Sequence, residues 1–138
     1  MRLGIESWFK FESPEQRKKK QEAFEAAVYP LGNEKQKEWE LSILRELFPK
    51  KRNIRDEHFQ LLVLRSSMLE SMAEHPEDET AYRNGAIRAW FDRKTPHGLS
   101  TDTKKTLIAL AVCENDAKSW DDLPSAAAIR SLIGMIPF

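Results

Sequence analysis

The feature that most constrains this chain is an apolar stretch between residues 55 and 75. Apolar side chains in this stretch surround most of the circumference of a helix: Phe59, Leu61, Leu62, Val63, Leu64, Met68, Leu69 and Met72. A helix that is apolar on most of its faces must be covered on several sides to keep water away. The pattern therefore predicts a central helix at roughly 55–75, around which the other segments pack.

Two helices are predicted before this central one. The first begins at the sequence Ser13-Pro14-Glu15-Gln16, whose serine, proline and glutamine form the pattern of a capping box. It is expected to end near Val28, because Pro30 and Gly32 follow. The second is expected to be capped by Asn33 and to end near Phe48, before a proline.

Three more helices are predicted at about 79–94, 101–114 and 125–136, and no segment shows the apolar-polar alternation of a strand. The expected fold class is therefore all-α, with about six helices in a single compact irregular bundle spanning residues 1–138. Residues 1–12 are expected to form an N-terminal arm or turn packed on that bundle. Gly85 lies inside one predicted helix, where glycine is unfavourable, so it is expected to allow close approach of another element.

Composition limits the class of protein. The chain has 138 residues, of which 41% are hydrophobic and 32% charged, as in a globular domain of ordinary size. No stretch approaches the apolar length of a membrane span. The single cysteine, Cys113, lies in an apolar run and is expected to be a small buried hydrophobe. A cytoplasmic location without membrane association is therefore predicted.

Charge is segregated along the chain, although 22 cations balance 22 anions. Residues 14–55 and 81–105 are net basic, whereas residues 56–80 are strongly acidic and residues 106–138 weakly so. Separate basic and acidic surfaces suit electrostatic complementarity with a protein partner or with a second copy of the chain. Ordinary solvated helix faces are the alternative explanation.

One basic linker is a candidate anion-binding site. Four cations precede or begin the central helix, and two more end the predicted helix at 79–94: Lys50, Lys51, Arg52 and Arg55, then Arg93 and Lys94. Such a cluster next to a helix N-terminus can bind a phosphate or a nucleic-acid backbone. Asp56 and Glu57 follow at once and offset part of its field. The two groups of cations also fall at the ends of similar segments, 43–51 and 86–94, which leaves open a short internal repeat.

Four apolar residues are candidates for an interface. Trp8 and Trp120 lie in irregular segments, where each either clamps a loop onto the bundle or stands exposed as an anchor. Met135 and Phe138 belong to an unusually apolar C-terminal segment, expected to be docked in the core or buried against a partner.

The case for an enzyme or a metal site is weaker. The chain lacks a phosphate-binding glycine loop, a nucleophile elbow and a dinucleotide fingerprint, and its three histidines lack the usual ligand spacing. No cofactor or metal is predicted. The segment 95–100, with His97 and Ser100, is the best place for a catalytic site. The leading hypothesis is a non-enzymatic protein-protein interaction or regulatory module, with nucleic-acid or phosphate-ligand binding through residues 50–55 as the alternative and an enzyme third.

Overall fold

A computed structural model describes residues 13–94 and 98–138 of the chain. The described residues form six α-helices and two short 3-10 helices without any strand, which confirms the all-α prediction. Residues 1–12, predicted to form an arm, lie outside the described part. The elements are α2 (Pro14–Val28), α3 (Asn33–Leu47), α4 (Arg55–Glu74), η1 (Pro76–Asp78), α5 (Glu79–Asp92), α6 (Thr101–Asp116), η2 (Trp120–Asp122) and α7 (Ala126–Ile133).

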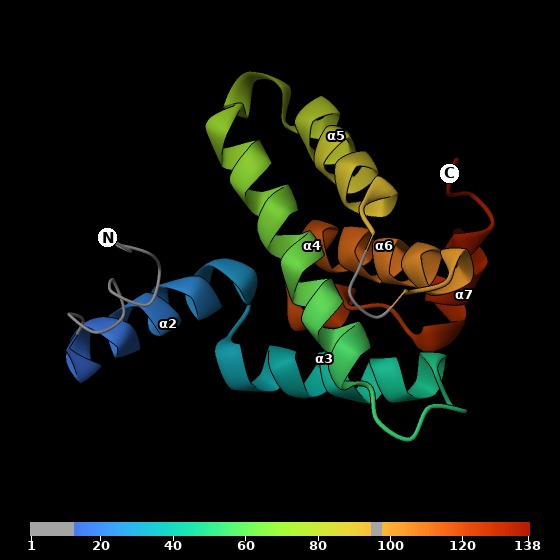
Figure 1. The fold of residues 1–138 in the computed structure, drawn as a ribbon, viewed down its shortest axis with the longest axis horizontal. Helices are drawn as coiled ribbons and strands as arrows, with labels where there is room; N and C mark the ends of the chain where they lie inside the picture. Colours follow the sequence, from blue (N-terminus) through green and yellow to red (C-terminus); the bar gives the residue numbers. More distant parts are fainter. Residues whose placement is uncertain (1–12, 95–97) are drawn as a thin grey trace, which may run out of the picture.

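Helix α4 is the central element, as its apolar circumference predicts. It is 20 residues long and touches α2, α3, α5 and α6 (Figure 1). Its inward side chains include Leu61, Leu64 and Met68, all of which are buried. Phe59 is the exception, because 59% of its surface is exposed. The central position of α4 therefore follows from its sequence, while one apolar face near its start stays uncovered.

The core is completed by side chains from α3, α5, α6 and α7. Helix α6 contributes a continuous buried run, residues 106–111, and crosses behind α4 in the view of Figure 1. Leu44 of α3, Trp90 of α5 and Ile129 of α7 are each fully or almost fully buried against the same cluster. Each large apolar side chain buried in this way contributes on the order of 2 kcal/mol of transfer free energy.

Helix α2 projects from the side of the bundle (Figure 1). Val28, in its last turn, is its one buried residue, and Phe24 is 43% exposed. The rest of α2 carries mainly charged and polar side chains, so it lacks an apolar stripe that could pack along its length. The start of α2 is as predicted: Ser13 Oγ accepts from Gln16 N at 3.1 Å, and Gln16 Oε1 accepts from Ser13 N at 3.0 Å.

The start of α3 differs from the prediction. Asn33 is not the cap but the first residue of the helix, and its side-chain amide contacts Glu25 Oε2 at 3.4 Å. The capping position is Gly32, whose φ of 136° lies in a region that other residues avoid. A Cβ atom placed on Gly32 would stand 3.4 Å from Cζ2 of Trp120. The turn between α2 and α3 therefore needs glycine for its backbone, and the indole leaves little room beyond a Cβ atom.

The expectation for Gly85 is wrong. A Cβ atom placed on this residue would meet nothing within 4 Å, and the residue is exposed on α5. No neighbouring element approaches its backbone, so the glycine is not needed for packing against the described residues.

Candidate functional site

One feature with a possible binding role is an apolar groove. It lies between α5, α6 and the C-terminal segment 132–138, and its volume is about 360 Å³. Its apolar lining comes from three elements: Ile87 of α5, Ile108, Ala109 and Val112 of α6, and Leu132, Met135, Ile136, Pro137 and Phe138 of the C-terminal segment. Concave apolar surfaces of this size are typical of binding sites.

Charged groups at the groove are mostly paired with one another. Arg83, the one charged side chain in the lining, donates from Nη1 to Asp116 Oδ1 at 3.1 Å. Its Nε atom is buried and has no hydrogen-bond partner among the described residues. Arg88 pairs with Asp92 at 3.0 Å, and its guanidinium lies 5.1 Å from the ring of Phe138. The groove is thus apolar inside, with Arg83 as its one charged lining residue.

The structure brings together two of the four predicted interface residues. Met135 lines the groove and is 77% exposed, and Phe138 forms part of the wall, with its ring 5.1 Å from that of Phe91. Trp120 does not line this groove. Its indole lies against Gly32, as expected of a residue that clamps a loop, while 39% of its surface is exposed. Trp8 lies outside the described residues.

The predicted anion-binding residues are divided between two pockets. Lys51 and Arg52 line a pocket of about 220 Å³ in the connection between α3 and α4. Lys50 and Arg55 are exposed nearby but do not line it. Lys94 lines a separate pocket of about 250 Å³, and Arg93 lines neither. The six cations therefore do not form one site.

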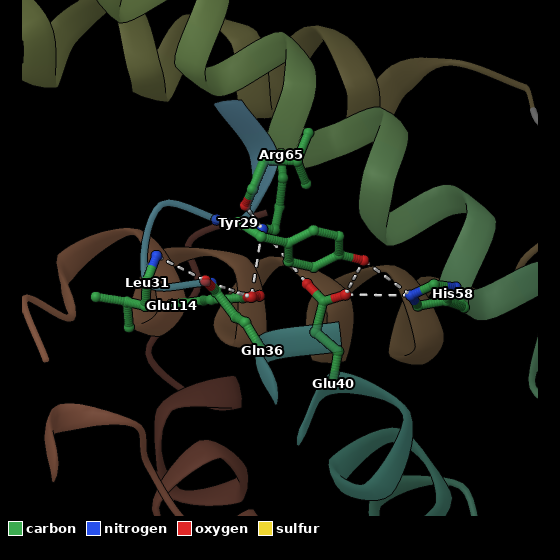
Figure 2. A network of polar contacts seen from close by, with 8 residues as sticks. Tyr29, Leu31, Gln36, Glu40, His58, Arg65 and Glu114 are labelled. Atoms are coloured by element: carbon green, nitrogen blue, oxygen red, sulfur yellow. Dashed lines mark hydrogen bonds and ion pairs between the residues drawn. The ribbon is translucent and has the colours of Figure 1, made fainter. Parts of the chain in front are cut away.

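Sequence reasoning missed a buried polar network, which is drawn in Figure 2. Glu40 of α3 is fully buried and accepts a hydrogen bond from the hydroxyl of Tyr29 at 2.8 Å. The same carboxylate oxygen lies 3.1 Å from Nε2 of His58, and the second oxygen lies 3.4 Å from Nη1 of Arg65. Three segments of the chain, namely the α2–α3 turn, α3 and α4, are thus joined around one carboxylate.

The other half of the network is centred on Glu114 of α6. Its Oε2 accepts from Nε2 of Gln36 at 2.8 Å and lies 3.3 Å from Nη1 of Arg65. Gln36 in turn accepts from the backbone N–H of Leu31 at 3.0 Å, and Arg65 donates to the carbonyl oxygen of Val28. These bonds tie the α2–α3 turn to α3, α4 and α6 (Figure 2).

Two buried carboxyl groups share the single guanidinium of Arg65, and their pKa values move apart. Burial and the neighbouring charge of Glu40 raise the pKa of Glu114 to about 9, so this group keeps its proton at neutral pH. Burial opposes ionisation of Glu40 too, but hydrogen bonds with His58 and Glu114 outweigh it and lower its pKa. A side-chain hydrogen bond with Glu40 also raises the pKa of Glu114, while Oε1 of Glu114 has no hydrogen-bond partner among the described residues. One negative charge then balances Arg65.

The network is suited to holding the fold rather than to acting on a substrate. Glu40, Arg65 and Glu114 are each no more than 1% exposed, and Nη1 of Arg65 contacts both carboxyl groups, whereas its Nε and Nη2 have no hydrogen-bond partner among the described residues. Burial and Glu40 also raise the pKa of the Tyr29 hydroxyl, which favours its role as a donor. The signal in the sequence was Arg65, the one cation between Phe59 and Met72, because a buried charge requires partners.

The predicted catalytic segment at 95–100 is described only in part. Ser100 is the cap of α6, and its Oγ accepts from Thr103 N at 3.1 Å. Its hydroxyl therefore has a structural partner. His97 and the two residues before it lie outside the described range. Cys113 is half-buried, and burial raises the pKa of its thiol, which is unfavourable for a nucleophile.

Within residues 13–94 and 98–138, no group of three His, Cys, Asp or Glu side chains is arranged to hold a metal ion. No helix in this part of the chain combines the length and the apolar character needed to cross a membrane. Comparison with known protein families, with characterised proteins and with solved structures found no match for the chain. Its function is therefore inferred from its own residues.

Proposed function

We propose that this chain is a non-enzymatic protein-binding module whose apolar groove receives a short segment of another protein. The observation that carries the proposal is the groove of about 360 Å³ between α5, α6 and the C-terminal segment, with Met135 exposed at its edge. Methionine suits such a surface because its flexible side chain adapts to different apolar partners. A cytoplasmic setting is part of the proposal, since the single cysteine has no partner for an internal disulfide.

The chemistry of the groove indicates what the bound segment contains. Its lining is apolar apart from Arg83 and Asn84, so the anchors of the partner are apolar side chains. Arg83 is the one charged side chain in the lining, which favours a carboxylate near the apolar anchors of the partner. We therefore infer a segment in which an acidic residue follows or precedes apolar anchors, as in helices that lie in apolar grooves.

Two substitutions distinguish binding in the groove from binding to apolar surface elsewhere on the protein. Met135→Glu places a charge at the groove, and Phe59→Glu places the same charge on the exposed part of α4. Both residues are more than half exposed, at 77% and 59%, so both variants are expected to fold. Phe59 does not line the groove, so its substitution is the matched control.

The experiment selects peptides from a displayed random library against the unaltered protein and measures their affinities for the two variants. We expect selected peptides to carry apolar anchors with an acidic neighbour. Their binding should weaken at least about tenfold with Met135→Glu and remain unchanged with Phe59→Glu. Self-association that Met135→Glu alone abolishes would also support a protein-binding groove, with a second copy as the partner.

Two results would overturn the proposal. One is a selection that yields no peptide whose binding depends on Met135. The other is saturable binding of a small apolar molecule in the groove with no peptide competing for it, since that would define a small-molecule site instead.

A further inference from the structure

A second, independent pocket lies in the connection between α3 and α4. Its volume is about 220 Å³, and it is lined by Arg45, Phe48, Pro49, Lys51, Arg52, Asn53 and Ile54. The connection is held at both ends, because Phe48 is half-buried, Ile54 is buried and Lys51 N donates to Phe48 O at 3.1 Å. Packing of these apolar residues on the bundle keeps the pocket in place between the two helices.

The cations of this pocket lack partners. Arg45 of α3 joins Lys51 and Arg52 in the lining, and no carboxylate lines the pocket. None of these three side chains makes an ion pair or hydrogen bond with a described residue. Three like charges crowded around one concavity repel one another, and a bound anion would relieve that repulsion. Asp56 and Glu57 follow closely in sequence, but neither lines the pocket.

The remaining lining suits the organic part of a ligand. Phe48, Pro49 and Ile54 offer apolar surface beside the cations, and the side chain of Asn53 adds a polar group. A phosphate monoester combines a doubly charged group, which arginine binds through paired hydrogen bonds, with an uncharged substituent. A continuous nucleic-acid backbone would instead need an extended basic track. The other predicted cations, Arg93 and Lys94, lie outside this pocket.

We propose that the pocket formed by Arg45, Lys51 and Arg52 binds the phosphate group of a small phosphate monoester. Arg45 and the two linker cations hold the phosphate oxygens, and Phe48 and Pro49 contact the substituent. This site is separate from the apolar groove and does not depend on the function proposed for it. It also differs from the sequence-based expectation, because Arg45 replaces Lys50 and Arg55.

The test uses the full chain and three probes in isothermal titration calorimetry: inorganic phosphate, phenyl phosphate and a short single-stranded DNA. Saturable binding of both phosphates is expected, with phenyl phosphate tighter because its ring meets the apolar wall. The double variant Lys51→Gln/Arg52→Gln is expected to weaken phenyl phosphate binding at least about tenfold. All substituted residues are exposed, and the thermal unfolding midpoint is compared first to confirm that each variant folds.

The matched control removes two cations from the same connection without touching the pocket lining: Lys50→Gln/Arg55→Gln. It changes the net charge by the same amount, so a general electrostatic effect would weaken binding equally in both variants. Affinity within about twofold of the unaltered protein is expected for this control. Equal loss in the two variants would overturn the proposal. So would the absence of saturable phosphate binding, or binding of the DNA alone, which would indicate an extended nucleic-acid surface.

Discussion

Because Glu114 is protonated beside the ionised Glu40, the substitution Glu114→Gln is expected to preserve the buried network. In the folded chain the carboxyl group of Glu114 has a pKa of about 9, so it is protonated at neutral pH. It forms a hydrogen bond with Glu40. A glutamine side chain has the same shape as this protonated form. Its carbonyl oxygen can accept from Gln36 and Arg65, and its amide can donate to Glu40, so the network is expected to survive the substitution.

The expected change in stability follows from the direction of the pKa shift. The pKa of Glu114 is raised from 4.5 to about 9, so between these two pH values the folded state binds more protons than the unfolded state. Stability of the unaltered protein therefore falls as pH rises through this window, and the loss reaches on the order of 3 kcal/mol at pH 7. Glutamine cannot ionise in the unfolded state, so the variant avoids this loss. We expect it to be more stable than the unaltered protein at neutral pH, and increasingly so as pH rises toward 9.

The assay is urea-induced unfolding followed by circular dichroism at several values between about pH 5 and about pH 9. Glu38→Gln, on the exposed side of α3, is the control for a change of charge alone, and we expect its difference from the unaltered protein to stay nearly constant with pH. Glu40→Gln is the contrasting variant. It removes the buried carboxylate that accepts from Tyr29 and contacts His58 and Arg65, so a loss of about 1–3 kcal/mol is expected. The reasoning would be refuted if Glu114→Gln were as destabilising as Glu40→Gln, or if its stability followed the same pH profile as the unaltered protein.

Three further predictions concern local structure. Gly85→Ala is expected to raise the free energy of unfolding by about 0.5–1 kcal/mol, because the site is helical and nothing crowds the added Cβ. Urea unfolding measures this change, and a lower free energy of unfolding in the variant would contradict the open surroundings of Gly85. Gly32→Ala is expected to lower the free energy of unfolding by about 1–2 kcal/mol, because φ there is 136° and the indole of Trp120 is close. A thermal midpoint equal to that of the unaltered protein would contradict this backbone conformation. Ser100→Ala is expected to cost about 1 kcal/mol, because α6 loses its cap; hydrogen exchange in the first turn of α6 should increase, and unchanged exchange would show that the cap contributes nothing.

The sequence indicates which residue types could form a binding site, but not which of them lie together in the fold. Lys51 and Arg52 were recognised as possible anion ligands, but Arg45 was not, because it sits in a helix where a cation is ordinarily solvated. Met135 and Phe138 were recognised as a possible interface from the apolar C-terminal segment. Nothing in the sequence indicated that residues of α5 and α6 would complete a groove with them. Contacts between distant segments depend on how helices cross, which local periodicity does not record.

The sequence by itself determined the helices, because their periodicity, caps and prolines act over a few neighbouring residues. The central position of α4 and the capping box at the start of α2 were both evident in this way. Tertiary structure decided which charges are buried, since Glu40 and Glu114 look like ordinary surface glutamates until Arg65 is placed between them. The physical reason is that the cost of burying a charge depends on partners up to 78 positions away in the chain, as in the Gln36–Glu114 bond.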